Sequence, residues 1–151
     1  MFVKNRRIVI KRAVWVLFVV YLSWLIYFLF FCEGYGRHPS ETYRYNLELF
    51  SEIKRYIKYY DTIGIKLFML NIVGNIVAFI PFGASLPIIN KKYKGFISTF
   101  LLGALFTLCI ETTQLIMRVG SFDVDDMILN TTGVVIGYII CKIMKLIYNR
   151  G

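Results

Sequence analysis

The chain has 151 residues, of which 58% are hydrophobic and 17% aromatic, and it carries a formal net charge of +9. A soluble domain is usually about 45–50% apolar, so this composition excludes an ordinary soluble domain, and it excludes a disordered chain as well. A basic soluble protein would suggest a nucleic-acid partner, but here the apolar runs and the positions of the charges indicate an all-α integral membrane protein with no nucleic-acid partner.

The first predicted element is a membrane span over residues 13–32, which follows a basic arm at residues 1–12. The run contains no charged residue, and about 20 apolar residues suffice to cross the hydrocarbon core. A cleaved signal peptide is the alternative. The run is longer than the usual apolar region of about 7–15 residues, and no small-x-small cleavage site follows it. We therefore expect an uncleaved anchor.

Residues 33–66 are too long for a simple turn, and we expect them to contain an amphipathic helix. Such a helix can lie in the headgroup plane, pack over the mouths of the spans, or merely connect them. The apolar positions recur at the period of one helix face: Tyr43, Leu47, Phe50, Ile53, Ile57 and Tyr60.

Three further spans are predicted at residues 67–89, 96–117 and 127–147, and they form a core over 67–147 with a tail at 148–151. Pro81, followed by Gly83, predicts a break or kink in the first of these spans. Gly133 and Gly137 have the spacing that lets two membrane helices approach closely.

Lysine and arginine concentrate in the N-terminal arm, between the second and third spans, and at the C-terminal end, where no acidic residue occurs. Basic residues favour the cytoplasmic side. This distribution predicts that both termini are cytoplasmic, with residues 33–66 and 118–126 facing outward.

Polar residues inside the spans are the main functional signal, because a carboxylate in hydrocarbon is costly unless it is paired or hydrated. They recur at helical spacing near the outward end of three spans, and we expect them to share one outward-facing pocket with two residues of the preceding segment. Interhelical hydrogen bonds that only hold the bundle together, at roughly 0.6 kcal/mol each, are the alternative. The predicted pocket residues are Arg44, Asn46, Asn71, Asn75, Glu111, Gln114, Arg118, Asp123, Asp126 and Asn130. Which of Asp123, Asp125 and Asp126 faces the pocket is left open.

Five segments resemble the VanZ-like family of bacterial membrane proteins. They are residues 44–47 (Arg-Tyr-Asn-Leu), 52–57 (Glu-Ile-Lys-Arg-Tyr-Ile), 71–83 (Asn-Ile-Val-Gly-Asn-Ile-Val-Ala-Phe-Ile-Pro-Phe-Gly), 111–114 (Glu-Thr-Thr-Gln) and 121–133 (Ser-Phe-Asp-Val-Asp-Asp-Met-Ile-Leu-Asn-Thr-Thr-Gly), with Gly137 after them. The resemblance covers about residues 44–140 and leaves the first span as an anchor without a family motif. It implies a multi-pass protein of the bacterial plasma membrane, with its site on the outer face, in a family named for association with resistance to the glycopeptide teicoplanin. It does not supply a reaction.

Three functions fit these observations. The favoured one is a protein that binds the headgroup of a membrane lipid or of a lipid-linked envelope precursor, without catalysis or a cofactor. The second is a metal-dependent enzyme acting on a lipid phosphate, in which Glu111, Asp123 and Asp126 would hold Mg²⁺ or Mn²⁺, since hard cations prefer oxygen ligands. The third is a structural subunit that docks another membrane protein.

Overall fold

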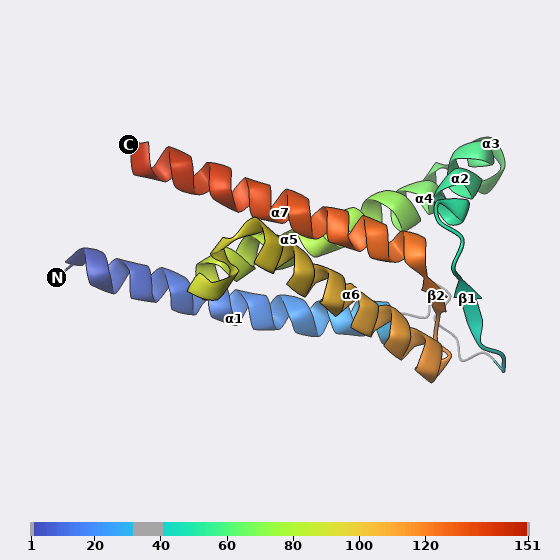
Figure 1. Ribbon diagram of the computed structural model, residues 1–151, viewed down its shortest axis with the longest axis horizontal. Helices are drawn as coiled ribbons and strands as arrows, with labels where there is room; N and C mark the ends of the chain where they lie inside the picture. The colour runs from blue at the N-terminus through green and yellow to red at the C-terminus, as the bar shows by residue number, and fades with distance from the viewer. Residues whose placement is uncertain (1, 32–40, 151) are drawn as a thin grey trace.

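The computed structural model describes residues 2–31 and 41–150, so that part of the loop expected at residues 33–66 lies outside the described residues. Within the described ranges, four helical segments are long and apolar enough to cross a membrane: Ile8–Phe31, Ile65–Ile89, Phe96–Met117 and Val124–Tyr148. They agree closely with the four predicted spans. The two termini lie at the same end of the bundle (Figure 1).

The first span belongs to α1 (Phe2–Phe31), the third to α6 (Phe96–Met117) and the fourth to α7 (Val124–Arg150). The second is composite: α4 (Ile65–Phe68), the π-helix η2 (Met69–Val73) and α5 (Gly74–Ile89) follow one another without a gap. The short 3₁₀ helix η3 (Lys91–Lys94) connects α5 to α6. The chain stays helical through Pro81, so of the predicted break or kink the break is wrong. The regular α-helix of the second span is interrupted at η2.

Helices α5 and α7 pack backbone to backbone, because glycines remove the side chains between them. A Cβ atom built on Gly133 would lie 2.1 Å from the Ile76 carbonyl oxygen, and one on Gly137 would lie 2.1 Å from that of Ile80. From the other side, a Cβ on Gly83 would lie 1.9 Å from the Val134 carbonyl oxygen. The close approach of α5 and α7 therefore depends on glycine at these positions.

The apolar core lies between α5, α6 and α1. The rings of Phe82 and Phe106 stack with centroids 4.5 Å apart, and Phe79 and Leu25 are fully buried. The Tyr21 hydroxyl donates to the Ala78 carbonyl at 2.6 Å and joins α1 to α5. These contacts fix the first and second spans against each other.

The end of the bundle away from the termini carries a small parallel sheet, and we call it the sheet end. Strand β1 (Arg44–Asn46) pairs with β2 (Ser121–Asp123), which directly precedes α7 (Figure 1). After β1 come α2 (Ser51–Lys58) and α3 (Tyr60–Ile63).

The continuous amphipathic helix expected from Tyr43 onward is therefore wrong in its first part. Residues 44–46 pair with β2 in the sheet. Phe50 has a left-handed φ of 63°, which interrupts a right-handed helix. The helical period of the sequence applies only from Ser51, where α2 begins.

Candidate functional site

The end of β2 and the first turn of α7 carry three carboxylates, Asp123, Asp125 and Asp126, and each has different partners. Asp125 is fully buried. Its Oδ1 accepts the backbone N–H of Phe50 at 2.5 Å. Its Oδ2 accepts those of Glu52 and Ile53 at 2.9 and 3.2 Å. Free N–H groups at a helix start are normally satisfied by a neighbouring side chain, so Asp125 caps α2 from a distant part of the chain.

Asp123 links β1, β2 and α6. Its backbone N–H donates to the Glu111 carboxylate at 3.1 Å, and Glu111 is 2% exposed. Its own carboxylate accepts the N–H of Asp125 at 2.8 Å and the amide of Asn46 at 3.2 Å. An anion is favoured near a helix N-terminus because the helix dipole is positive there. Glu111 and Asp123 therefore position the start of α7.

Asp126 faces the second span, where Asn75 donates its amide to the Asp126 carboxylate at 2.6 Å. One turn earlier, Asn71 lies inside the π-helix η2 and donates to the carbonyl of Leu67 at 2.9 Å. Single π-helical turns occur frequently at functional sites. Here the π-helical turn carries Asn71 and Ile72 to the edge of a cavity.

The cavity has a volume of about 650 Å³ and lies at the sheet end, between β1, α2, η2 and the start of α7. Its walls are mostly polar and carry charges of both signs. It is lined by Tyr43, Arg44, Tyr45, Asn46, Glu52, Ile53, Arg55, Tyr56, Asn71, Ile72, Gly120, Ser121, Asp123, Asp125, Asp126 and Leu129.

The acidic and basic groups of the cavity differ in how far the protein already satisfies them. The aspartates accept the bonds described above, and Glu52 pairs with Arg55 at 2.5 Å. The Arg44 side chain, by contrast, makes no hydrogen bond or ion pair with any residue that the structure describes, and it is exposed. The cavity therefore presents an available guanidinium, which matches the geometry of phosphate and carboxylate groups.

Burial affects the protonation of two cavity acids. It raises the pKa of Asp123 above its ordinary value of 3.8, although the N–H of Asp125 and the amide of Asn46 partly oppose the shift. It likewise raises the pKa of Glu52, against the influence of Arg55. Both groups thus keep a proton to higher pH than they would in water.

The raised pKa of Asp123 predicts that the stability of the protein depends on pH. An acid with a raised pKa binds protons more readily in the folded state, so its contribution to stability is present at low pH and is lost as pH rises through the raised value. We expect the wild type to gain more stability than Asp123→Asn as pH falls from 7 toward the ordinary pKa of 3.8. The measurement is the free energy of unfolding of both proteins in detergent over this pH range. The same pH dependence in the two proteins would contradict the prediction.

Of the ten predicted pocket residues, five line the cavity: Arg44, Asn46, Asn71, Asp123 and Asp126. Asn75 and Glu111 lie behind Asp126 and Asp123, whose positions they support. The other three are Gln114, Arg118 and Asn130.

These three residues do not line the cavity, and each contacts a different neighbour. Gln114 donates to the Leu29 carbonyl of α1 at 3.1 Å. Asn130 donates to the Thr107 hydroxyl of α6 at 2.9 Å. The Arg118 guanidinium lies over the Tyr43 ring, 4.4 Å from its centroid.

Sequence reasoning missed four of the cavity's functional groups, since it did not assign Glu52, Arg55 and Tyr56 to the pocket and did not see that Asp125 caps α2. The polar face of the predicted helix was the available signal for Glu52 and Arg55. No local pattern pointed to the role of Asp125.

The proposed metal ligands do not converge. Glu111 and Asp126 make separate contacts with Asp123 and Asn75. Within residues 2–31 and 41–150, no three His, Cys, Asp or Glu side chains form a group that could hold a metal ion.

Comparisons with known proteins agree with the motif pattern. A family model described as VanZ/LLP1 matches residues 18–145, so the match includes most of the first span, which the resemblance over residues 44–140 left out. A 65-residue stretch is 37% identical to "Protein VanZ" of Enterococcus faecium; it covers 43% of this chain and only 40% of that relative. No solved structure gives a significant match. Because the family model spans most of the chain, this protein belongs to the VanZ/LLP1 family.

Proposed function

We propose that this protein binds the anionic headgroup of a lipid, or of a lipid-linked cell-wall precursor, in the polar cavity at the sheet end. The available guanidinium of Arg44 carries the proposal, because the cavity's carboxylates already have partners inside the protein. Arg44 would meet phosphate, with Asn46 and Asn71 beside it as cavity-lining amides. The protein would act by binding, and no catalytic step is required.

The location of the cavity supports a ligand from the outer leaflet. The connection between α5 and α6 and the C-terminal end, both rich in basic residues, lie away from the sheet end (Figure 1). Such residues favour the cytoplasm. With both termini cytoplasmic, the cavity opens at the outer face of a bacterial plasma membrane. Membership in the VanZ/LLP1 family supports a role in the cell envelope that is associated with resistance to glycopeptides such as teicoplanin.

The test is binding of two anionic probes, phosphatidylglycerol and a polyprenyl phosphate, measured by native mass spectrometry of detergent-purified protein. A hydrogen bond to a charged group contributes about 1.5–3 kcal/mol, so Arg44→Gln should weaken binding by about tenfold or more. Which of the two probes binds more tightly distinguishes a phospholipid from a precursor.

Lys58→Gln is the matched control, since Lys58 is an exposed cation of α2 that does not line the cavity. It should bind both probes as the wild type does. Equal binding by wild type and Arg44→Gln would refute the proposal. Equal losses in the two variants would show that only general surface charge attracts the lipid.

A further inference from the structure

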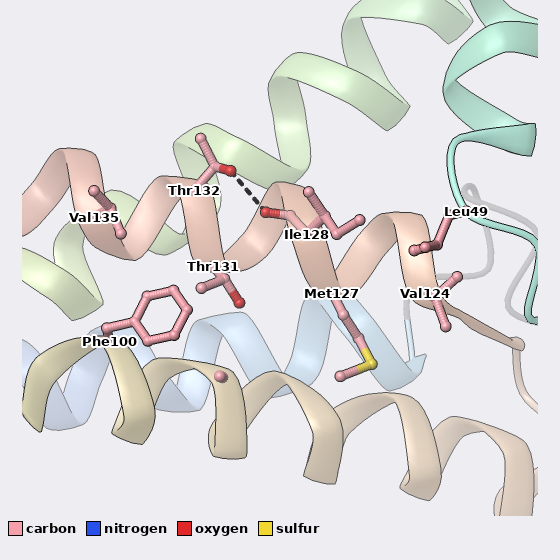
Figure 2. A pocket seen from close by; sticks show the side chains of 9 residues that line it. Leu49, Phe100, Val124, Met127, Ile128, Thr131, Thr132 and Val135 are labelled. Carbon is pink, nitrogen blue, oxygen red and sulfur yellow. Dashed lines mark hydrogen bonds between the residues drawn. The ribbon is translucent and has the colours of Figure 1, made fainter. Parts of the chain in front are cut away.

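A second cavity lies on a different side of α7, between α7 and α6 (Figure 2). Its volume is about 500 Å³. Phe100 and Ala104 of α6 line it together with Val124, Met127 and Val135 of α7. Leu49, from the connection between β1 and α2, lies at its sheet end. The five predicted pocket residues that line the polar cavity do not line this second cavity.

The walls of this second cavity, which we call the groove, offer almost no hydrogen-bonding groups to a polar ligand. Two threonines are its only polar side chains, and the Thr132 hydroxyl donates to the Ile128 carbonyl of its own helix at 2.8 Å (Figure 2). Thr131 contributes one further hydroxyl. Burial of apolar surface is therefore the main favourable interaction that the groove can make.

The length of the groove along α7 and its position in the bundle both match one leaflet of a membrane. From Val124 to Val135 the helix advances by about 16 Å, at 1.5 Å per residue, which is about half of the ~30 Å hydrocarbon core. Both walls belong to membrane-spanning segments. The medium at its mouth is thus hydrocarbon, and the groove extends inward from the level of the sheet end.

A helix of a second copy is a poorer occupant. Close helix contacts in membranes use small residues, and the glycines of α7, Gly133 and Gly137, already face α5. The α7 wall of the groove consists of branched or long side chains, and Ala104 is the small residue on the α6 side. The space between them suits a flexible chain better than a second helix.

We propose that the groove between α6 and α7 holds one hydrocarbon chain of an outer-leaflet lipid. Leu49 lies at its sheet end and is exposed, so it would sit in the interface where such a chain enters. The site is separate from the polar cavity, and the inference shares with the proposed function only the cytoplasmic position of the termini.

The test uses full-length protein in vesicles of phosphatidylcholine that contain a small fraction of phosphatidylcholine with a photoreactive acyl chain. After irradiation, labelled peptides are mapped by mass spectrometry. We expect labelling of residues 124–135 to exceed that of the exposed lipid-facing positions Leu101 and Leu105 by at least severalfold. If all lipid-facing positions of the wild type were labelled equally, this result alone would overturn the proposal.

Variants give a second, independent readout. Ala104→Phe should fill the groove and reduce labelling of residues 124–135 severalfold, whereas Leu101→Phe, on the exposed face of the same helix, should not. Arg44→Gln should label as the wild type does, so this result separates the groove from the headgroup cavity. Undiminished labelling in a folded Ala104→Phe, or a stable dimer that protects both walls, would refute a lipid chain as the occupant.

Discussion

Replacing Asp125 with alanine should detach α2 from the bundle while the four spans stay packed. The three backbone N–H groups of Phe50, Glu52 and Ile53 would lose their only acceptor among the described residues. Loss of a helix cap costs up to about 2 kcal/mol, and here the acceptor is a buried carboxylate. We expect amide hydrogen exchange at residues 50–58 to accelerate about thirtyfold, which corresponds to that cost.

The matched control is Glu48→Ala, which removes an exposed carboxylate from the same segment. Only the backbone of Glu48 accepts hydrogen bonds, from Ser51. Exchange in α2 should therefore remain as in the wild type. If Asp125→Ala also left exchange unchanged, Asp125 would not be what holds α2.

The second large effect is expected at the contact between α5 and α7. In Gly133→Ala the new methyl group would meet the Ile76 carbonyl at 2.1 Å, and a backbone atom cannot rotate aside as a side chain can. Overpacking costs typically 1–3 kcal/mol and sometimes more. We expect about 3 kcal/mol, measured as a shift of the unfolding transition of the detergent-solubilised protein.

Gly74→Ala provides the comparison within the second span. A Cβ atom there would lie 3.6 Å from the Met69 carbonyl oxygen, which is an ordinary contact. Since alanine favours helix more than glycine does, this variant should be as stable as the wild type or slightly more so. Similar transitions for Gly133→Ala and Gly74→Ala would contradict the packing described for α5 and α7.

The four spans were predictable because hydrophobicity is a property of about 20 consecutive residues. The pairing of β1 with β2 was not, since it joins Asn46 to Asp123 across 77 positions of the chain. The same long-range pairing displaced the start of the expected helix from Tyr43 to Ser51.

Within the spans, spacing predicted which face of a helix is polar but not which neighbour that face meets. Asp126 and Asn130 are one turn apart on α7. Even so, Asp126 faces Asn75 on α5 while Asn130 faces Thr107 on α6. The arrangement of the helices around α7 determines these partners, and a single sequence does not encode that arrangement locally.

The parallel pairing of β1 with β2 has a consequence for synthesis. The ribosome produces Arg44 long before Ser121, its partner in the sheet. Until the last span emerges, Asp125 is absent as well, and the segment that carries Arg44 has no strand to join and α2 has no cap. The polar cavity therefore cannot form before the start of the last span is made, and a nascent chain halted before Ser121 would have three spans in the membrane and no such cavity.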